Sequence, residues 1–509
     1  MKRLFKNTVF TSIDYFVLIV LNLLATPILI KHFGVDGYGA FVFLSIFSIY
    51  GALSFFDFGM EGALMNYVAR FEADKDKGKL QNTLSASVLY YTFLGLALGV
   101  GIHLAGDIIA GRLIEENGTI SLDSVRRAIS FISINIFLQF LSVPFMAILQ
   151  GLRRFVITKS LSSIITTARY LLIIFIAIKY HRIDYAFAII SGLTFIMLVV
   201  LLYIFTFNLA YFKKMRVRFD WKLLKTLFNY SSILFINRII GLICNQAPKF
   251  LIWLYLTVSS LTIFDVVSRP ANLLRLVMSI LNSAIVPEVA RLHQLKDLKS
   301  ISGLFINLTR YAYLIILPIV AVMGVYINDL LRLWVGEEFV PYSFMAIILL
   351  AVYIVLPIPS VASTMVVGLE KVKQTIWIGI VSTIINVGLS LSLLQFIGLP
   401  GLMIGAFCGE AFGLIPYLLA MKKFLKFNLG DAIKPLFPIA FASVFFMLMH
   451  FALRYVFKGQ TIPIISCVAV TLFANYLVNY KYLLSGEERN FLRGRLAALK
   501  NRMNKPNGA

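Results

Sequence analysis

Apolar segments of twenty or more residues recur from one end of this 509-residue chain to the other. Each segment is long enough to cross a hydrocarbon core of ~30 Å as an α-helix. Only 14% of the residues are charged, whereas a soluble protein carries roughly a quarter. The sequence between the segments is too short for a sizeable soluble domain. We therefore predict an all-α integral membrane protein.

The apolar pattern predicts fourteen transmembrane helices. They cover residues 9–30, 38–58, 84–105, 125–149, 160–178, 185–209, 230–254, 260–285, 304–327, 342–367, 372–396, 399–421, 433–453 and 462–482. A basic loop over 213–218 divides the first twelve into an N-terminal half (1–212) and a C-terminal half (226–421). Two extra spans follow within 432–482, and a basic tail covers 485–509. Segments 27–41 and 248–264 each pair a proline-marked span with a short polar turn, which suggests an internal repeat.

The distribution of basic residues predicts the orientation in the membrane. Of the 47 Lys and Arg residues, 32 fall in the segments expected on the cytoplasmic side and nine in the loops opposite. This asymmetry follows the positive-inside rule for an even number of spans with both termini cytoplasmic. Because the positive charge lies in short loops, the formal charge of +23 does not indicate a nucleic-acid partner. The three cysteines lack paired spacing, so neither a disulfide framework nor a metal site is expected.

Ionisable residues inside predicted spans are the first candidates for a functional site, because each costs roughly 2.5–3.5 kcal/mol in hydrocarbon. Asp265 and Arg269 lie four residues apart in the eighth span, so they share a helix face and can neutralise each other. Arg275 points away from that pair. These residues could act as structural ion pairs, or the arginines could line a cavity and bind phosphate or pyrophosphate.

Three further cations fall within the spans. Arg238 and Lys249 lie eleven residues apart in the seventh span, close to three turns and hence on one face. Arg169 is in the middle of the fifth span. Arg238 could extend to the cytoplasmic headgroups, whereas Lys249 is favoured as a cavity residue together with Arg275. For Arg169 both interpretations stay open.

Carboxylates in the spans are candidate coupling or gating groups. Asp14 and Asp57 lie near the cytoplasmic ends of spans one and two, and Glu410 lies well inside span twelve. Together with Asp265, they could take up a proton or a sodium ion. The alternative is capping of helix ends or pairing with an arginine. A stripe of small residues on span twelve is expected to pack against a neighbouring helix, namely Gly401, Gly405, Gly409 and Gly413.

The chain shows no pattern typical of catalysis. It has no Walker loop, no HExxH motif and no metal spacing among its five histidines. We predict that it is not an enzyme and uses no cofactor, with H⁺ or Na⁺ as the candidate coupling ion. The tyrosines and phenylalanines are interpreted mainly as lipid-facing and interfacial residues.

Several motifs resemble those of one family of transporters. They are Gly34-Val-Asp-Gly-Tyr-Gly-Ala-Phe41, Phe56-Asp-Phe-Gly-Met-Glu-Gly-Ala63, Tyr67-Val-Ala-Arg70, Leu149-Gln-Gly-Leu-Arg-Arg-Phe155, Ile285-Val-Pro-Glu-Val-Ala-Arg-Leu292 and Val367-Gly-Leu-Glu-Lys371. In order and spacing the chain resembles the Wzx-type polysaccharide flippases of the multidrug/oligosaccharidyl-lipid/polysaccharide (MOP) exporter superfamily. The resemblance is spread over most of the chain, and fourteen spans suit it.

The resemblance implies two six-helix bundles around a central cavity, and alternating access in the bacterial inner membrane. It also implies an undecaprenyl-pyrophosphate-linked oligosaccharide as substrate, moved to the outer leaflet for O-antigen, capsule or exopolysaccharide synthesis. Membrane lipids and polysaccharide polymerase machinery are the expected partners. The main alternative is an ion-coupled drug or metabolite exporter of the same superfamily. A second is a membrane-embedded glycosyltransferase, although the longest loop outside the cytoplasm, near 106–124, is short for such an enzyme.

Overall fold

All regular elements in the described part of this computed structural model are helices. The structure describes residues 2–49, 51–114, 120–208, 221–282, 285–425, 428–456 and 476; for 2–19, 208, 221–223, 229–230, 232–234, 236–238 and 429 it gives the backbone alone. Ten helices within these ranges are long and apolar enough to cross a membrane. They match predicted spans three to six and eight to thirteen, which confirms the fold class. Span fourteen and the basic tail lie outside the described residues.

Helix α1 (Lys2–Leu44) contains the first predicted span and the start of the second, with a break at Gly34. Gly34 has a φ of 77°, a conformation that glycine adopts without the Cβ clash of other residues. After α1 the backbone is irregular as far as the 3₁₀ segment η1 (Ala52–Asp57), and Phe58 and Gly59 then take left-handed conformations. The predicted second span is therefore not one continuous helix.

Irregular backbone at membrane depth has to find its hydrogen-bond partners inside the protein. The N–H of Ile49 donates to the side-chain oxygen of Gln139 over 3.0 Å. The hydroxyl of Tyr90 donates to the carbonyl of Phe56 over 3.3 Å. Side chains of neighbouring helices thus satisfy backbone groups that a continuous helix would have satisfied itself.

The chain divides into two compact units. Unit 1 comprises Met1–Val266 and Val387–Leu402, and unit 2 comprises Val267–Asn386 and Met403–Ala509. The three boundaries fall inside helices, one each in α9 (Val258–Asn282), α14 (Val372–Ile397) and α15 (Leu399–Leu425). The predicted lobes over 1–212 and 226–421 stay a prediction.

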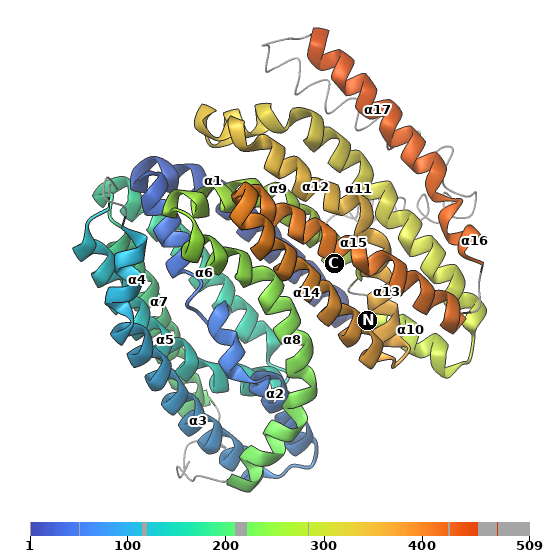
Figure 1. Cartoon of the computed structure of the whole chain (residues 1–509). Coiled ribbons are helices and arrows are strands. Elements are labelled where there is room, and N and C mark those ends of the chain that lie inside the picture. The colour runs from blue at the N-terminus through green and yellow to red at the C-terminus, as the bar shows by residue number, and fades with distance from the viewer. Residues whose placement is uncertain are drawn as a thin grey trace, which may run out of the picture. The chain divides into compact units, whose positions relative to one another are not determined.

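Unit 1 is built on α5 (Leu122–Gly151), which packs between α3 (Lys77–Leu104) and α7 (Ile183–Tyr203), as Figure 1 shows. Gly95 and Gly99 of α3 allow this close packing: a Cβ at Gly99 would lie 2.7 Å from the carbonyl oxygen of Ser133 on α5. The other helices of the unit are α2 (Met60–Ala73), α4 (Gly106–Leu113), α6 (Phe155–Tyr180) and α8 (Trp221–Tyr255), with the π-helical η2 (Ile204–Asn208) continuing α7.

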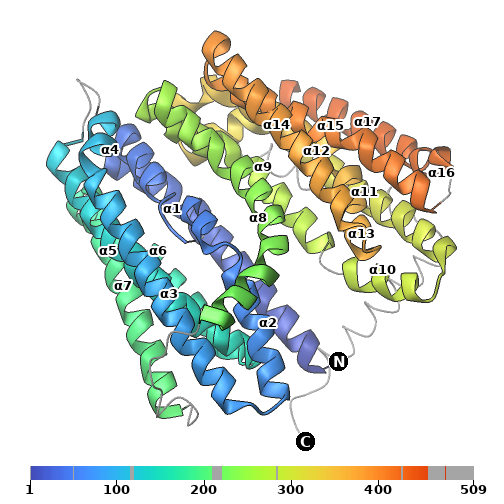
Figure 2. The same ribbon diagram turned by 60° about the horizontal axis from the view of Figure 1, so that its bottom comes forward.

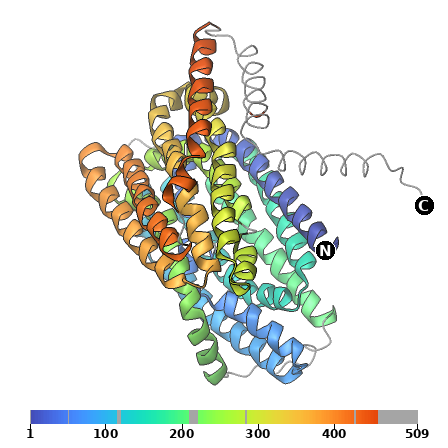
Figure 3. The ribbon, with the colours of Figure 1, turned by 90° about the vertical axis from the view of Figure 1, so that its right-hand side faces the viewer.

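Unit 2 is built on α11 (Leu298–Trp334). Its remaining helices are α10 (Ile285–Gln294), η4 (Glu337–Tyr342), α12 (Ser343–Val355), α13 (Pro357–Gly368), α16 (Leu429–Ile433) and α17 (Leu436–Val456). Helix α17 runs beside α11 (Figures 1 and 3). Polar contacts fix it there: Arg454 forms an ion pair with Asp329 over 3.1 Å and donates to the carbonyl of Val325 over 2.7 Å.

The turn between α2 and α3 in unit 1 has a counterpart between α10 and α11 in unit 2. Lys75 and Lys296 both have a φ of 56°, and the aspartate that follows each of them caps the next helix. The pKa of Asp76 is lowered because its carboxylate accepts a backbone N–H. The hydroxyl and N–H of Ser300 lower the pKa of Asp297 in the same way. The same dipeptide, Lys-Asp, thus forms the turn and caps the following helix in both units.

A second matched feature joins these short helices to the long ones. Gly151, at the end of α5, packs on Val68 of α2, and Gly368, at the end of α13, packs on Val289 of α10; Figure 2 shows α10 beside α13. A Cβ at either glycine would lie 2.8 Å or less from the valine side chain. The second residue after each glycine has a left-handed φ, 58° and 61°. Both pairs of features support the predicted internal repeat.

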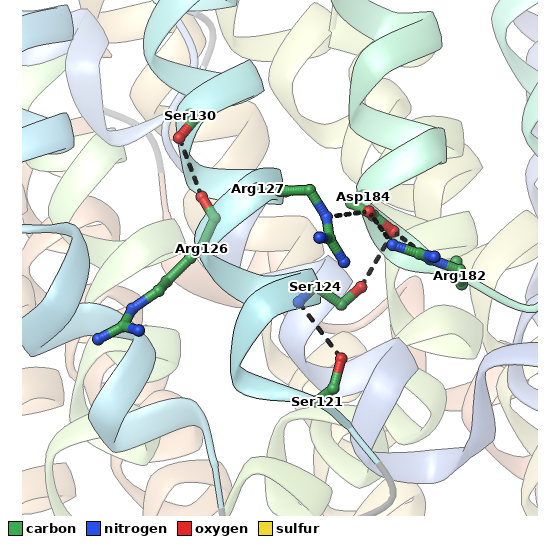
Figure 4. A network of polar contacts seen from close by, with 7 residues as sticks. All are labelled: Ser121, Ser124, Arg126, Arg127, Ser130, Arg182 and Asp184. Atoms are coloured by element: carbon green, nitrogen blue, oxygen red, sulfur yellow. Dashed lines mark hydrogen bonds and ion pairs between the residues drawn. The ribbon is translucent and has the colours of Figure 1, made fainter.

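Asp184, at the start of α7, is the centre of an ionic network in unit 1 (Figure 4). Its side chain is 1% exposed and accepts hydrogen bonds from Arg127 over 2.9 Å, Arg182 over 2.7 Å and the hydroxyl of Ser124 over 3.0 Å. Because the two guanidinium groups are about half exposed, water solvates them while they neutralise the carboxylate. The network ties the starts of α5 and α7 together.

The glycine contacts can be tested by adding one methyl group. Gly151→Ala and Gly368→Ala should each lower the free energy of unfolding by roughly 1–3 kcal/mol, because the methyl has no room against the valine. Gly192→Ala is the matched control, since nothing lies within 4 Å of a Cβ there. Thermal unfolding in detergent measures the effect. Equal unfolding temperatures for all three variants would contradict the packing argument.

The ionic network predicts an asymmetry between its members. Asp184→Asn keeps hydrogen-bond acceptors for solvated arginines and should cost about 1 kcal/mol. Removing both arginines, with Arg127→Ala and Arg182→Ala together, leaves a buried carboxylate unneutralised and should cost roughly 3–5 kcal/mol. Chemical unfolding of the purified protein compares the two. A lower free energy of unfolding for Asp184→Asn than for the variant without both arginines would contradict this order of effects.

Candidate functional site

The candidate charged residues whose side chains are described lie on five elements of the fold. Arg169 is on α6, Lys249 on α8 and Asp57 on η1; Asp265, Arg269 and Arg275 are on α9, and Glu410 is on α15. The side chains of Asp14 and Arg238 lie outside the described residues. Among the described residues, no group of three or more His, Cys, Asp or Glu side chains is arranged to hold a metal ion. The site chemistry is therefore built from hydrogen bonds and charge pairs.

The first turns of α9 interlock with the segment that follows the break in α1. Ser259 donates to the carboxylate of Asp36, and Thr262 donates to the carbonyl of Val35 over 2.6 Å. A Cβ at Gly39 would lie 2.3 Å from the carbonyl oxygen of the first residue of α9, so only glycine fits at this contact. The segments that meet here come from opposite halves of the sequence. All of these residues belong to unit 1.

A chain of polar side chains continues from this interlock into unit 1. The hydroxyl of Tyr38 donates to the carboxylate of Asp265 over 2.8 Å and lies 3.4 Å from the hydroxyl of Thr26. One turn before Thr26, Asn22 donates to the hydroxyl of Tyr170 on α6 over 2.5 Å. The sequence singled out Asp265 for its neighbour Arg269, and the structure adds Tyr38, 227 positions away, as a partner.

Asp57 forms a separate site at the end of η1. Its side chain is fully buried and accepts a hydrogen bond from the hydroxyl of Tyr91 on α3, which is also fully buried. A buried carboxylate needs hydrogen bonds or a cation, and Tyr91 supplies a hydrogen bond at the point where the broken second span ends. Asp57 and Asp265 are thus bound by different tyrosines. Neither tyrosine was singled out from the sequence, where the aromatic residues were interpreted mainly as lipid-facing and interfacial.

Lys249 and Arg169 are half-buried in unit 1. One turn after Lys249 on α8, Trp253 stacks on Phe43 with ring centroids 5.0 Å apart. The guanidinium of Arg112 lies over the same indole ring at 5.8 Å. These aromatic contacts hold the end of α8 against α1 and α4, and so set the position of Lys249 along the unit.

In unit 2 the structure brings two candidate residues together. Arg275 of α9 and Glu410 of α15 attract each other electrostatically, and Arg275 also hydrogen-bonds to Tyr353 of α12. Tyr353 is 2% exposed and Glu410 is half-buried, whereas Arg275 is exposed. Sequence reasoning had placed both charges at mid-span without relating them to each other. Tyr353, which interacts with both, was missed.

Small residues beside Glu410 pack as the glycine stripe predicted. A Cβ at Gly409 would lie 2.7 Å from the Cβ of Asn386 on α14, and one at Gly401 would lie 2.6 Å from the backbone of Leu393. Gly413 makes an ordinary contact at 3.7 Å with Pro359. The close approach of α14 and α15 at Gly409 fixes the backbone next to Glu410.

The fold is similar to that of "Lipid II flippase MurJ, inward closed conformation", with a TM-score of 0.72 and 15% identity over 94% of this chain and 100% of that chain. It is also similar to an inward-facing multidrug resistance MATE family transporter of the MOP superfamily, with a TM-score of 0.65 and 14% identity over 80% of this chain and 94% of that chain. At such identities the likeness shows the fold alone.

No curated protein matches the sequence. A family model described as "Polysaccharide biosynthesis protein" matches residues 38–344, more than half of the chain. The match begins at Tyr38, includes α9 with its three charged candidates, and ends at the start of α12. The chain therefore belongs to this family of polysaccharide biosynthesis proteins, which confirms the family resemblance that its motifs indicated.

Proposed function

We propose that this multi-pass membrane protein is a flippase that moves an undecaprenyl-pyrophosphate-linked oligosaccharide from the cytoplasmic to the outer leaflet of the bacterial inner membrane. The family match and the MOP-type fold support a transporter of lipid-linked substrates. The observation that carries the proposal is Arg275, a guanidinium that is exposed at mid-span in a polysaccharide biosynthesis protein. A permanently charged fork at this depth suits the oxygens of a pyrophosphate.

The other cations would serve the same anionic headgroup. Arg269 lies one to two turns before Arg275 on α9, while Lys249, Arg238 and Arg169 come from α8 and α6. Lys249 would act as a point charge, whereas the arginines offer two parallel hydrogen bonds to a phosphate. The carboxylates Asp265, Asp57, Asp14 and Glu410 stay candidates for coupling to H⁺ or Na⁺, or for gating.

The interlock of α9 with the segment after Gly34 is a candidate gate. By the predicted topology it lies on the side opposite the cytoplasm, because it follows the first span. Among the described residues it includes two side-chain hydrogen bonds and one close glycine contact. Such contacts can separate without unfolding a helix. In an alternating-access cycle they would break when the substrate leaves toward the outer leaflet.

A second candidate is an ion-coupled exporter, since the MATE family transporter has a similar fold. Deletion of the gene in its host separates the two. For the flippase, lipid-linked oligosaccharide should accumulate on the cytoplasmic leaflet and surface polysaccharide should be lost. Complementation with the wild-type gene is the control. Intact surface polysaccharide together with increased sensitivity to cationic dyes would reject the flippase and support the exporter.

The gate can be tested with a reversible crosslink. In a variant whose native Cys244, Cys408 and Cys467 are serines, Asp36→Cys and Ser259→Cys should form a disulfide, because the two wild-type side chains are in hydrogen-bond contact. Oxidation should stop flipping in proteoliposomes, and a reductant should restore it. Each single-cysteine variant serves as a control. Full transport by the oxidised double variant would show that this contact is not a gate.

A further inference from the structure

Two histidines from distant parts of the sequence meet where the first part of α1 ends. The Nδ1 atoms of His32 and His181 lie 3.2 Å apart, with ring centroids 4.9 Å apart. Nδ1 of His181 also lies 3.3 Å from the carbonyl oxygen of His32. Both residues belong to unit 1, and the predicted topology places them on the side opposite the cytoplasm. His181 is exposed and His32 is half-buried, so water reaches the pair.

Each histidine is presented by a defined piece of backbone. His181 ends α6 in a left-handed conformation, with a φ of 53°, and its N–H donates to the carbonyl of Ala177 over 3.2 Å. Three residues later, the ionic network of Asp184 holds the start of α7. His32 lies two residues before the break at Gly34. The pair therefore joins the end of the first part of α1 to the turn between α6 and α7.

The distance between the two Nδ1 atoms limits the charge that the pair can hold. Across 3.2 Å one nitrogen donates and the other accepts, so one of the two Nδ1 atoms is without a proton. One imidazolium can still donate to a neutral imidazole in this geometry. When both rings are protonated, two N–H donors face each other and two positive charges are in contact. The contact is therefore compatible with one positive charge but not with two.

The surrounding charges also oppose a second proton. The charged residues of the segments that meet here are Lys31 and Asp36 of α1, Arg127 of α5, Lys179 of α6, and Arg182 and Asp184 around the start of α7. Asp184 is neutralised by two arginines, and Asp36 is bound in the interlock. Burial, His181 and Lys31 all lower the pKa of His32, burial most. A histidine whose pKa is lowered by folding stabilises its contact above the ordinary value of about 6.5, and that stabilisation is lost as the pH falls below it.

The histidine pair adjoins the candidate gate. Val35 and Asp36, which form the α1 side of the interlock, follow His32 by three and four residues. Gly34 lies between them, and its φ of 77° marks the kink in α1. The histidine contact thus holds one end of this short segment, and the interlock holds the other. Loss of the contact frees the end at His32.

We propose that His32 and His181 form a proton-binding pair on the outer side, and that a second proton releases α1 from the α6–α7 turn and so weakens the candidate gate. The proton comes from the outer solution, because His181 is exposed. The pair is thus an H⁺ site outside the hydrocarbon, distinct from the candidate carboxylates. The release does not depend on what the protein transports, whereas its effect on a gate rests on the proposed function.

The release can be measured as a distance between two spin labels on the full-length protein in lipid nanodiscs. With the three native cysteines replaced by serine, Leu24→Cys on α1 and Ile178→Cys on α6 place the labels at exposed positions. As the pH falls from about 7.5 to about 5, a second and longer distance should appear, with its midpoint below about pH 6.5. His32→Gln and His181→Gln should each abolish the change, because one ring alone cannot carry two charges.

His103→Gln is the matched control, because His103 is an exposed histidine on α3 of the same unit, and this variant should respond as the wild type does. Backbone hydrogen exchange of residues 33–39, corrected for its intrinsic pH dependence, reports on the interlock. In acid, this exchange should become at least about threefold faster in the wild type, and not in either glutamine variant.

A wild-type distance that does not change with pH, or a change that persists in both glutamine variants, would overturn the proton-binding pair. Should one glutamine variant fail to fold, the other decides, because loss of either ring removes the second charge. Longer distances without faster exchange at 33–39 would reject the link to the gate. The proposed function fails separately: intact surface polysaccharide on gene deletion rejects the flippase and leaves the pH-dependent distance unaffected.

Discussion

The structure depends on one constraint, which is that every polar group at membrane depth must find a partner inside the protein. The effect of this constraint is clearest where the backbone is not helical. The irregular stretch after α1 persists because Gln139 and Tyr90 take over backbone hydrogen bonds that a helix would have made. The charged side chains follow the same rule. Asp57 lies at the end of one such irregular stretch, so a departure from regular helix coincides with one of the candidate residues.

Tyrosine is the recurrent partner of these charges. Tyr38 bonds Asp265, Tyr91 bonds Asp57, and Tyr353 bonds Arg275. A phenol can donate to a carboxylate or accept from a guanidinium, so one residue type can hold charges of either sign in position.

Hydropathy was sufficient for the long helices, since spans three to six and eight to thirteen depend only on uninterrupted apolar length. It failed for the second span, where the helix ends at Leu44 and the segment before Asp57 is a short 3₁₀ turn, without any loss of apolar character. The charged candidates were identified because an ionisable side chain in hydrocarbon carries a high free-energy cost. Their partners were not, because Tyr91 lies 34 positions from Asp57 and Tyr38 lies 227 from Asp265. Helical periodicity relates neighbours along one helix and contains no information about such distant pairs.

The repeated turns and the unrepeated polar groups have different origins in the fold. The Lys-Asp turns and the glycine–valine contacts recur in both units because a short amphipathic helix must join two long ones in each half, and the local geometry allows few solutions. Interior polar groups face no such requirement. Among the described residues, the contacts assigned here use carboxylates with tyrosine in unit 1, and arginine, tyrosine and a carboxylate in unit 2. A repeated frame can therefore diverge in chemistry without changing its fold.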